Sequence, residues 1–202
     1  MTLPTDAAQS EDWNGPAEAS PDTKRLGMKI FMASWTFSFV ALLVAYVVLR
    51  FGARVWPPDG LPHPPLVLTG LATFAAIGSS VVLQLGVGEL HKGRPEQLEG
   101  ALGFASLLGV LFLGLQTMAG VQAWRMGLEP NVNAYTGIFW VTAVFHALHV
   151  LVGVGALMRL WLRARSRGLD DSGTLTVELW TYFWHSIDLA WLAIFAVMFL
   201  PY

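Results

Sequence analysis

The sequence contains no cysteine and little charge. The lack of cysteine excludes disulfides, thiolate metal sites, iron–sulfur clusters and covalent c-type haem, so a redox centre would need histidine ligands. Lys, Arg, Asp and Glu make up 13% of the 202 residues and hydrophobic residues 54%, whereas a soluble domain carries about 25% charge. The composition therefore predicts an integral membrane protein with a single membrane domain.

The first 22 residues contain five acidic residues and no Lys or Arg. They also lack the apolar run of a secretory signal and the arginines of a transit peptide. We expect residues 1–25 to form a polar, disordered cytoplasmic tail, and residues 26–202 to form the membrane domain.

Five apolar stretches are long enough to cross a membrane, since about 20 helical residues span a hydrocarbon core of roughly 30 Å. The expected spans are approximately 30–49, 66–88, 101–124, 137–160 and 179–200. The predicted fold is therefore all-α, an integral membrane bundle of five transmembrane helices.

The basic residues are distributed unevenly between the two sides of this bundle. Three precede the first span, two lie between the second and third, and four lie at or after the end of the fourth, so nine of the twelve fall on one side. Positive charge accumulates on the cytoplasmic side. We therefore expect a cytoplasmic N-terminus and a periplasmic C-terminus.

The fifth span carries Asp188, the only carboxylate well inside any span, together with His185. An Asp within a membrane helix costs about 3 kcal/mol on insertion scales, so it needs a partner. Trp184, Asp188, Trp191 and Phe195 follow helical spacing and form an aromatic stripe on one face. This stripe predicts a packing surface.

The fourth span contains His146 and His149, three residues apart on one helical face. The small residues Gly153, Gly155 and Ala156 follow one turn later and indicate close helix contact. Hydrogen-bonded structural histidines are the favoured interpretation.

Depth along the helices suggests a partner for Asp188. At about 1.5 Å per residue, His149 lies some 18 Å from the outer end of its helix and Asp188 some 14 Å from the inner end. We therefore predict that His149 or His146 reaches Asp188 or His185 directly or through water. Gln116, near the middle of the third span, is expected to form an interhelical hydrogen bond.

Two other uses of these polar residues remain open. A b-type haem needs an axial histidine from each of two facing helices, and a single HxxH does not supply both. Two histidines and a carboxylate are a known metal-ligand set, which His146, His149, His185 and Asp188 could provide.

Five segments resemble, in order, subunit III of haem–copper terminal oxidases. The most specific are FHALHVLVG in the fourth span and FWHSIDLAW in the fifth. LGMKIFMASWTFSFVALLVAYVVLR, PLVLTGLATFAAIGSS and LGVLFLGLQ support them in the first three spans. The resemblance covers about residues 26–202.

This resemblance implies a short form of the subunit that lacks the first two helices of seven-helix versions. It implies an accessory chain with no catalytic centre and no cofactor of its own, with haem and copper held only in partner subunits. The expected partners are oxidase subunit I directly, subunit II, a small subunit IV and membrane lipids including a phospholipid in a cleft, but no nucleic acid. The whole complex would reduce oxygen to water in a bacterial cytoplasmic membrane, with electrons from cytochrome c or quinol.

The family is also thought to protect the oxidase from inactivation during turnover, and to assist proton uptake through buried carboxylates. Two of those carboxylate positions differ here: Trp35 follows Ala-Ser in the first span, and Ala119 stands three residues after Gln116 in the third. Asp188 therefore remains as the intramembrane proton-handling candidate.

Three alternative functions remain. The chain also resembles the five-helix protein that accompanies nitric oxide reductases. A haem b membrane anchor with quinol chemistry at His146 and His185 belongs to another class. A small proton-conducting transporter built around Asp188 is the third alternative.

Overall fold

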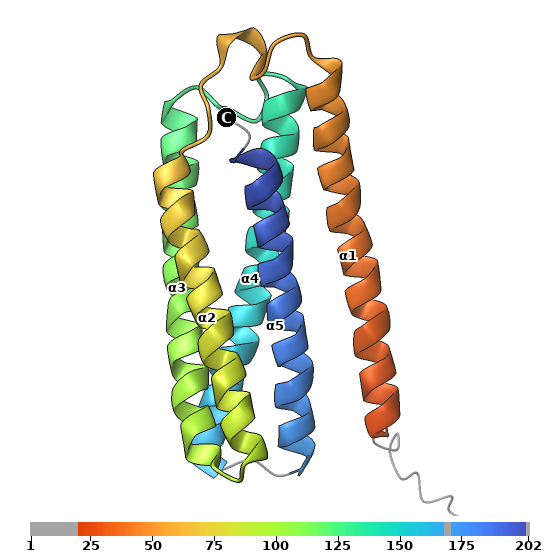
Figure 1. Ribbon diagram of the computed structural model, residues 1–202, viewed down its shortest axis with the longest axis vertical. Coiled ribbons are helices and arrows are strands. Elements are labelled where there is room, and N and C mark those ends of the chain that lie inside the picture. Colours follow the sequence, from red (N-terminus) through yellow and green to blue (C-terminus); the bar gives the residue numbers. More distant parts are fainter. Residues whose placement is uncertain (1–19, 168–170, 201–202) are drawn as a thin grey trace, which may run out of the picture.

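The computed structural model describes residues 20–167 and 171–200. Within these residues the chain forms five long α-helices and one short 3-10 helix (Figure 1). The α-helices are α1 Pro21–Gly52, α2 Leu66–His91, α3 Pro95–Arg125, α4 Ala134–Arg167 and α5 Asp171–Met198, and the 3-10 helix η1 is Pro58–Gly60. All five α-helices are long and apolar enough to cross a membrane. The predicted all-α, five-helix membrane fold is confirmed.

The helices extend beyond the predicted spans because polar and capping residues continue them past the apolar core. Ser20 caps α1 by accepting a hydrogen bond from the Thr23 amide, with Pro21 in the first turn. Residues 21–25 of the predicted tail are thus helical, and residues 1–19 lie outside the described residues. The fifth span was predicted to reach residue 200, but α5 ends at Met198.

A three-residue turn joins α2 to α3 and makes them an antiparallel pair. Gly93 has a φ of +76° in this turn, a left-handed conformation that favours glycine. Pro95 then begins α3, where its missing amide hydrogen is not needed. Gly86 lets the two helices approach closely, since a Cβ there would lie 2.3 Å from the Cβ of Ala101.

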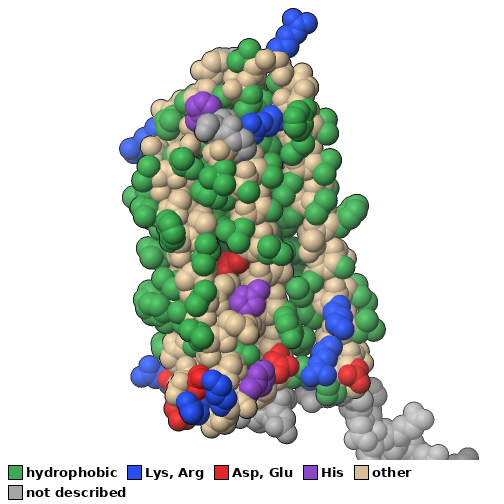
Figure 2. Space-filling model, viewed as in Figure 1, with side chains coloured by type: hydrophobic (Ala, Val, Ile, Leu, Met, Phe, Trp, Pro, Cys, Tyr) green, Lys and Arg blue, Asp and Glu red, His purple; other side chains and the backbone are tan. Residues whose placement is uncertain are grey.

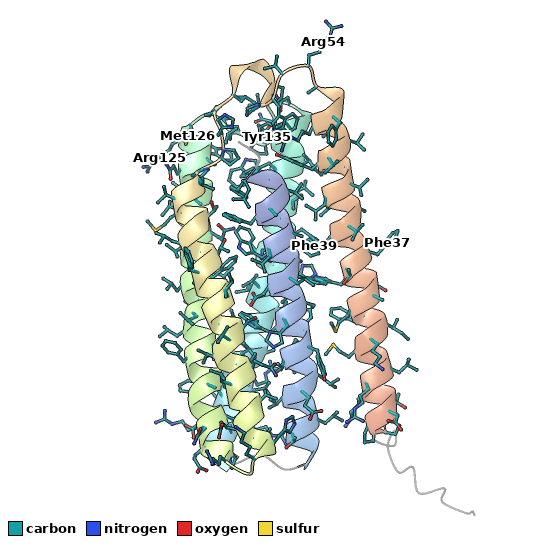
Figure 3. The ribbon with its side chains drawn as sticks, viewed as in Figure 1. Phe37, Phe39, Arg54, Arg125, Met126 and Tyr135 are labelled. Carbon is teal, nitrogen blue, oxygen red and sulfur yellow. The ribbon has the colours of Figure 1, made fainter. Side chains whose placement is uncertain are left out.

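Helices α2 to α5 form a tight group, and α1 lies at one side of it against α4 and α5 (Figure 1). Phe39 points from α1 toward the group, whereas Phe37 points away and is 76% exposed (Figure 3). Hydrophobic side chains cover the sides of the bundle, and charged ones gather mainly at the lower end (Figure 2). Here "lower" denotes the end where α1 begins, and "upper" the end where it finishes.

Candidate functional site

Trp184 of α5 is the packing centre of the bundle. It is 2% exposed, and its indole N–H donates to Ser79 Oγ of α2 over 2.9 Å. The ring occupies space left by two glycines on other helices: a Cβ at Gly109 of α3 or at Gly153 of α4 would lie 2.8 Å from it. One side chain therefore joins four helices. The predicted close contact occurs at Gly153, but a Cβ at Gly155 would meet nothing within 4 Å.

Asp188 and His185 are joined through α2. The Ser80 hydroxyl donates to an Asp188 carboxylate oxygen and lies 2.9 Å from His185 Nδ1. The other ring nitrogen, Nε2, is 3.0 Å from Gln84 Oε1. Asp188, Ser80, His185 and Gln84 thus lie in a row between α2 and α5, each within hydrogen-bond distance of the next, and Ser80 is the bridge.

A further contact extends this arrangement upward. Trp191 Nε1 donates to Thr73 Oγ1 over 3.0 Å. We name the whole set the α2–α5 seam; it consists of Thr73, Ser79, Ser80 and Gln84 on α2 and Trp184, His185, Asp188 and Trp191 on α5. Three residues of the α5 stripe, Trp184, Asp188 and Trp191, therefore contact α2.

His146 has a different environment. Its ring stacks on Trp191, with centroids 5.2 Å apart and an angle of 29°, and it meets Phe112 of α3 edge-on. The residue is 1% exposed, and neither ring nitrogen has a hydrogen-bond partner among the residues that the structure describes. The same is true of Gln116 Oε1 on α3. The sequence predicted an interhelical hydrogen bond for Gln116, and the carboxamide oxygen forms none within the described residues.

Both groups line a cavity of about 510 Å³ in the upper half of the bundle, which we name the upper cavity. Its walls come from α3, α4, α5 and the start of α2, including Phe112, Gln116, Val121, Trp124, Val144, His146 and Trp191. Ala119, where the resemblance led us to expect a carboxylate, is another wall residue.

His149 lies on the side of α4 that faces α1. Its Nδ1 is 2.6 Å from the carbonyl oxygen of Phe145 in its own helix, and Trp35 packs 5.3 Å from its ring. Within residues 20–167 and 171–200, no hydrogen bond joins His146 or His149 to Asp188 or His185. The direct form of the predicted link is therefore not made, because Ser80 of α2 supplies the partner. The water-mediated form stays a prediction.

The sequence analysis missed the α2 half of the seam. Thr73, Ser80 and Gln84 recur at i, i+7 and i+11, which places them on one face of an otherwise apolar helix. Polar residues at helical spacing inside a membrane span are a signal for an interhelical contact. That spacing, together with the Ser79–Ser80 pair, could have identified the partner of α5.

A second cluster lies at the lower end, outside the apolar core. Glu178 of α5 accepts from His91 of α2 over 3.1 Å and is 3.9 Å from Arg25 of α1. A cavity of about 430 Å³, the lower cavity, opens beside this cluster between α1 and α5 and has Lys29 and Tyr182 on its walls. Within the described residues, no three His, Asp or Glu side chains gather closely enough to hold a metal ion.

The family model for cytochrome c oxidase subunit III matches residues 11–201, nearly the whole chain. The chain belongs to the cytochrome c oxidase subunit III family. A cytochrome c oxidase subunit 3 from Synechocystis sp. is 29% identical over 202 residues, covering 96% of this chain and 85% of that protein. One from Thermostichus vulcanus is 28% identical over 185 residues, covering 91% and 90%. The Aedes aegypti protein is 29% identical over 178 residues, and the chain covers 66% of its length.

In this subunit III, Trp35 fills the position where the resemblance led us to expect a glutamate. The indole is 5% exposed and packs against Phe39, His149 and Phe183, so it joins α1 to α4 and α5 through rings. Its Nε1 has no hydrogen-bond partner in the described part of the chain. An indole cannot exchange a proton as a carboxylate does, so this position serves packing.

Proposed function

We propose that this subunit III is a non-catalytic accessory subunit of a proton-pumping haem–copper oxidase, and that it stabilises the catalytic subunit I. The observation that carries the proposal is the α2–α5 seam. Asp188, the only carboxylate well inside a span, is hydrogen bonded to Ser80 inside the bundle. A carboxylate held in this way contributes to helix packing, since an unpaired one would strongly destabilise the membrane helix.

The proposal includes haem and copper held by partner subunits, electrons from cytochrome c or quinol, and subunit II and a small subunit IV as further partners. It also includes a bacterial cytoplasmic membrane, with the lower end of the bundle in the cytoplasm. The distribution of Lys and Arg supports this orientation.

Phospholipid binding is a further part of the proposal, and the lower cavity supports it. Arg25 and Lys29 supply positive charge beside the apolar side chains of Met28 and Met32. Basic residues next to an apolar wall at a helix end suit an anionic headgroup with its acyl chains. Lipid extracted from the purified complex should fall by about one molecule when both basic residues are replaced by Gln.

Removing the chain tests the accessory role. We expect the complex without it to begin oxygen reduction at a similar rate, but to lose activity sooner during turnover. The catalytic subunit that co-purifies with a tagged chain should consume oxygen; one that reduces nitric oxide instead would favour the reductase alternative. A Soret band stoichiometric with the isolated chain would favour the haem anchor.

A second candidate function, proton relay, has support in the bridge at Ser80. A hydroxyl can donate on one side and accept on the other, so Ser80 connects Asp188 to His185 without a gap. Asp188→Asn would slow proton uptake by the assembled oxidase if the seam relays protons. Unchanged proton uptake with intact assembly would favour a purely structural role for Asp188. Proton flux through liposomes that hold only this chain would favour the transporter alternative.

A further inference from the structure

Two residues that line the upper cavity carry polar atoms with no protein partner among the described residues. These are the two ring nitrogens of His146 on α4 and the carboxamide oxygen of Gln116 on α3. Each has less than 1 Å² of exposed surface, and no residue that the structure describes is bonded to them. A buried polar atom without a partner costs about 1–3 kcal/mol, so the site favours a ligand that supplies the missing hydrogen bonds.

The rest of the cavity is apolar and elongated. Its α3 wall runs from Phe112 to Arg125, about 20 Å at 1.5 Å per residue, and Arg125 marks the upper end of the bundle (Figure 3). Apolar walls do not hold water, which needs two to four polar partners for each molecule. Water alone would therefore leave most of the roughly 510 Å³ unfilled, and an acyl chain alone would leave the nitrogens of His146 unpaired.

The hydrogen-bond donors and acceptors of the site indicate which polar group the ligand carries. A neutral imidazole offers one N–H donor and one acceptor nitrogen, and Gln116 Oε1 is an acceptor. A carbonyl group on the ligand could only accept, which would leave the acceptors of the site unpaired. A hydroxyl group can accept from the imidazole N–H and donate its one hydrogen to Gln116 Oε1, so it pairs two of the three atoms.

We propose that the upper cavity binds an apolar membrane molecule that ends in a hydroxyl group, with that hydroxyl hydrogen bonded to His146 and Gln116. The cavity can be entered sideways from the lipid phase, since its walls include Val121 and Trp124 on α3 and Val144 on α4, which are 47%, 50% and 51% exposed. Two sources share this chemistry: a hydroquinone from the membrane quinone pool and a lipid alcohol such as a diacylglycerol. The site does not depend on the function proposed above.

Equilibrium dialysis of the assembled complex with tritiated 1-dodecanol tests this site. His146→Phe retains a ring against Trp191 and removes both nitrogens. His149→Phe is the matched control, because it changes the same residue type on the same helix outside the cavity. We expect one saturable site per complex, with a Kd at least tenfold weaker in His146→Phe and unchanged in His149→Phe.

Competition then identifies the source of the ligand. Decylhydroquinone kept reduced and dioctanoylglycerol are compared as competitors, and the stronger one names the natural class. Dodecane, which has no hydroxyl, should not displace the probe. Equal affinity in the wild type and His146→Phe, displacement by dodecane as effective as by dodecanol, or no saturable binding would each overturn the proposal.

A second variant covers the case in which His146→Phe prevents assembly. Val144→Trp adds bulk at the exposed entrance and leaves the buried residues in place. We expect it to abolish the saturable site while the complex assembles normally. Undiminished binding in this variant would contradict entry and residence in the upper cavity.

Discussion

Polar groups on the two sides of α5 differ in their hydrogen bonding. On the α2 side, indole, imidazole and carboxylate groups all find hydrogen-bond partners in the α2–α5 seam. On the α4 side, Trp191 only stacks on His146, whose ring nitrogens have no partner among the described residues. The same helix thus forms a hydrogen-bonded interface with α2 and, through Trp191, a stacked contact with an α4 histidine whose nitrogens are unpaired.

The difference shows how small polar residues determine which helices associate in a membrane. Hydroxyl groups are short, so Thr73, Ser79 and Ser80 bond to α5 while the helices stay close. The α4 side uses glycine and aromatic rings for close packing, and no hydroxyl in the described part of the chain bonds to His146. Packing and hydrogen bonding are therefore separate contributions, and single substitutions can test each.

Trp184→Ala should have the largest effect on stability. It removes the ring that joins four helices and the indole N–H bond to Ser79, whose hydroxyl still donates to Ala105 O. Truncation of a buried aromatic residue costs about 3–5 kcal/mol. Trp124→Ala is the control, because that ring is 50% exposed. The measurement is unfolding of the purified chain in mixed micelles with increasing SDS. Similar unfolding midpoints for both variants would contradict the assignment of Trp184 as the packing centre of the bundle.

Gly153→Ala should have the next largest effect. The new Cβ would lie 2.8 Å from the Trp184 ring, and overpacking of this kind costs about 1–3 kcal/mol. Gly155→Ala introduces the same methyl group two residues away, where nothing lies within 4 Å. The same unfolding assay should show a loss for the first variant and none for the second. Equal losses would point to helix backbone effects instead of ring packing.

Ser80→Ala should destabilise the chain by about 0.6–2 kcal/mol, the range of hydrogen bonds between membrane helices. It removes the bridge between Asp188 and His185 but leaves both groups in place. Ser106→Ala is a matched control, since that buried hydroxyl bonds only to Leu102 of its own helix. A double-mutant cycle with Asp188→Asn should give a coupling energy within the same range. Zero coupling would show that Ser80 and Asp188 contribute independently.

His146→Phe should cause the smallest loss in ligand-free detergent, and we expect none, because it removes buried nitrogens whose lack of a partner costs about 1–3 kcal/mol. No protein hydrogen bond is lost, and the new ring can still stack on Trp191. His185→Phe changes the same residue type on the other side of α5 and loses the bonds to Ser80 and Gln84. A loss for His146→Phe as large as for His185→Phe would erase the contrast between the two faces.

The sequence predicted the helices well, because each apolar run is long and has few charges. It also directed attention to Asp188 and the stripe of Trp184 and Trp191. It did not identify the partner helix, since depth along α4 and α5 limits height but not rotation about the helix axis. His149 illustrates this: it lies on the α4 face toward Trp35 and bonds to Phe145 in its own helix. Rotation depends on packing of glycines against Trp184, which a single sequence does not reveal.

The long sequence separation across the α2–α5 seam has a consequence for biosynthesis. Its bonds join residues 101–118 positions apart, whereas the α2–α3 pair needs only a three-residue turn. The α2–α3 hairpin can therefore form early in translation. Thr73, Ser79 and Ser80 can bond to α5 only after that last helix leaves the ribosome. A nascent chain that stops before α5 leaves empty the space beside Gly109 and Gly153 that Trp184 occupies. It also leaves Ser80 without either of its α5 partners, whereas Thr73 and Ser79 still donate to backbone carbonyls of α2 and α3.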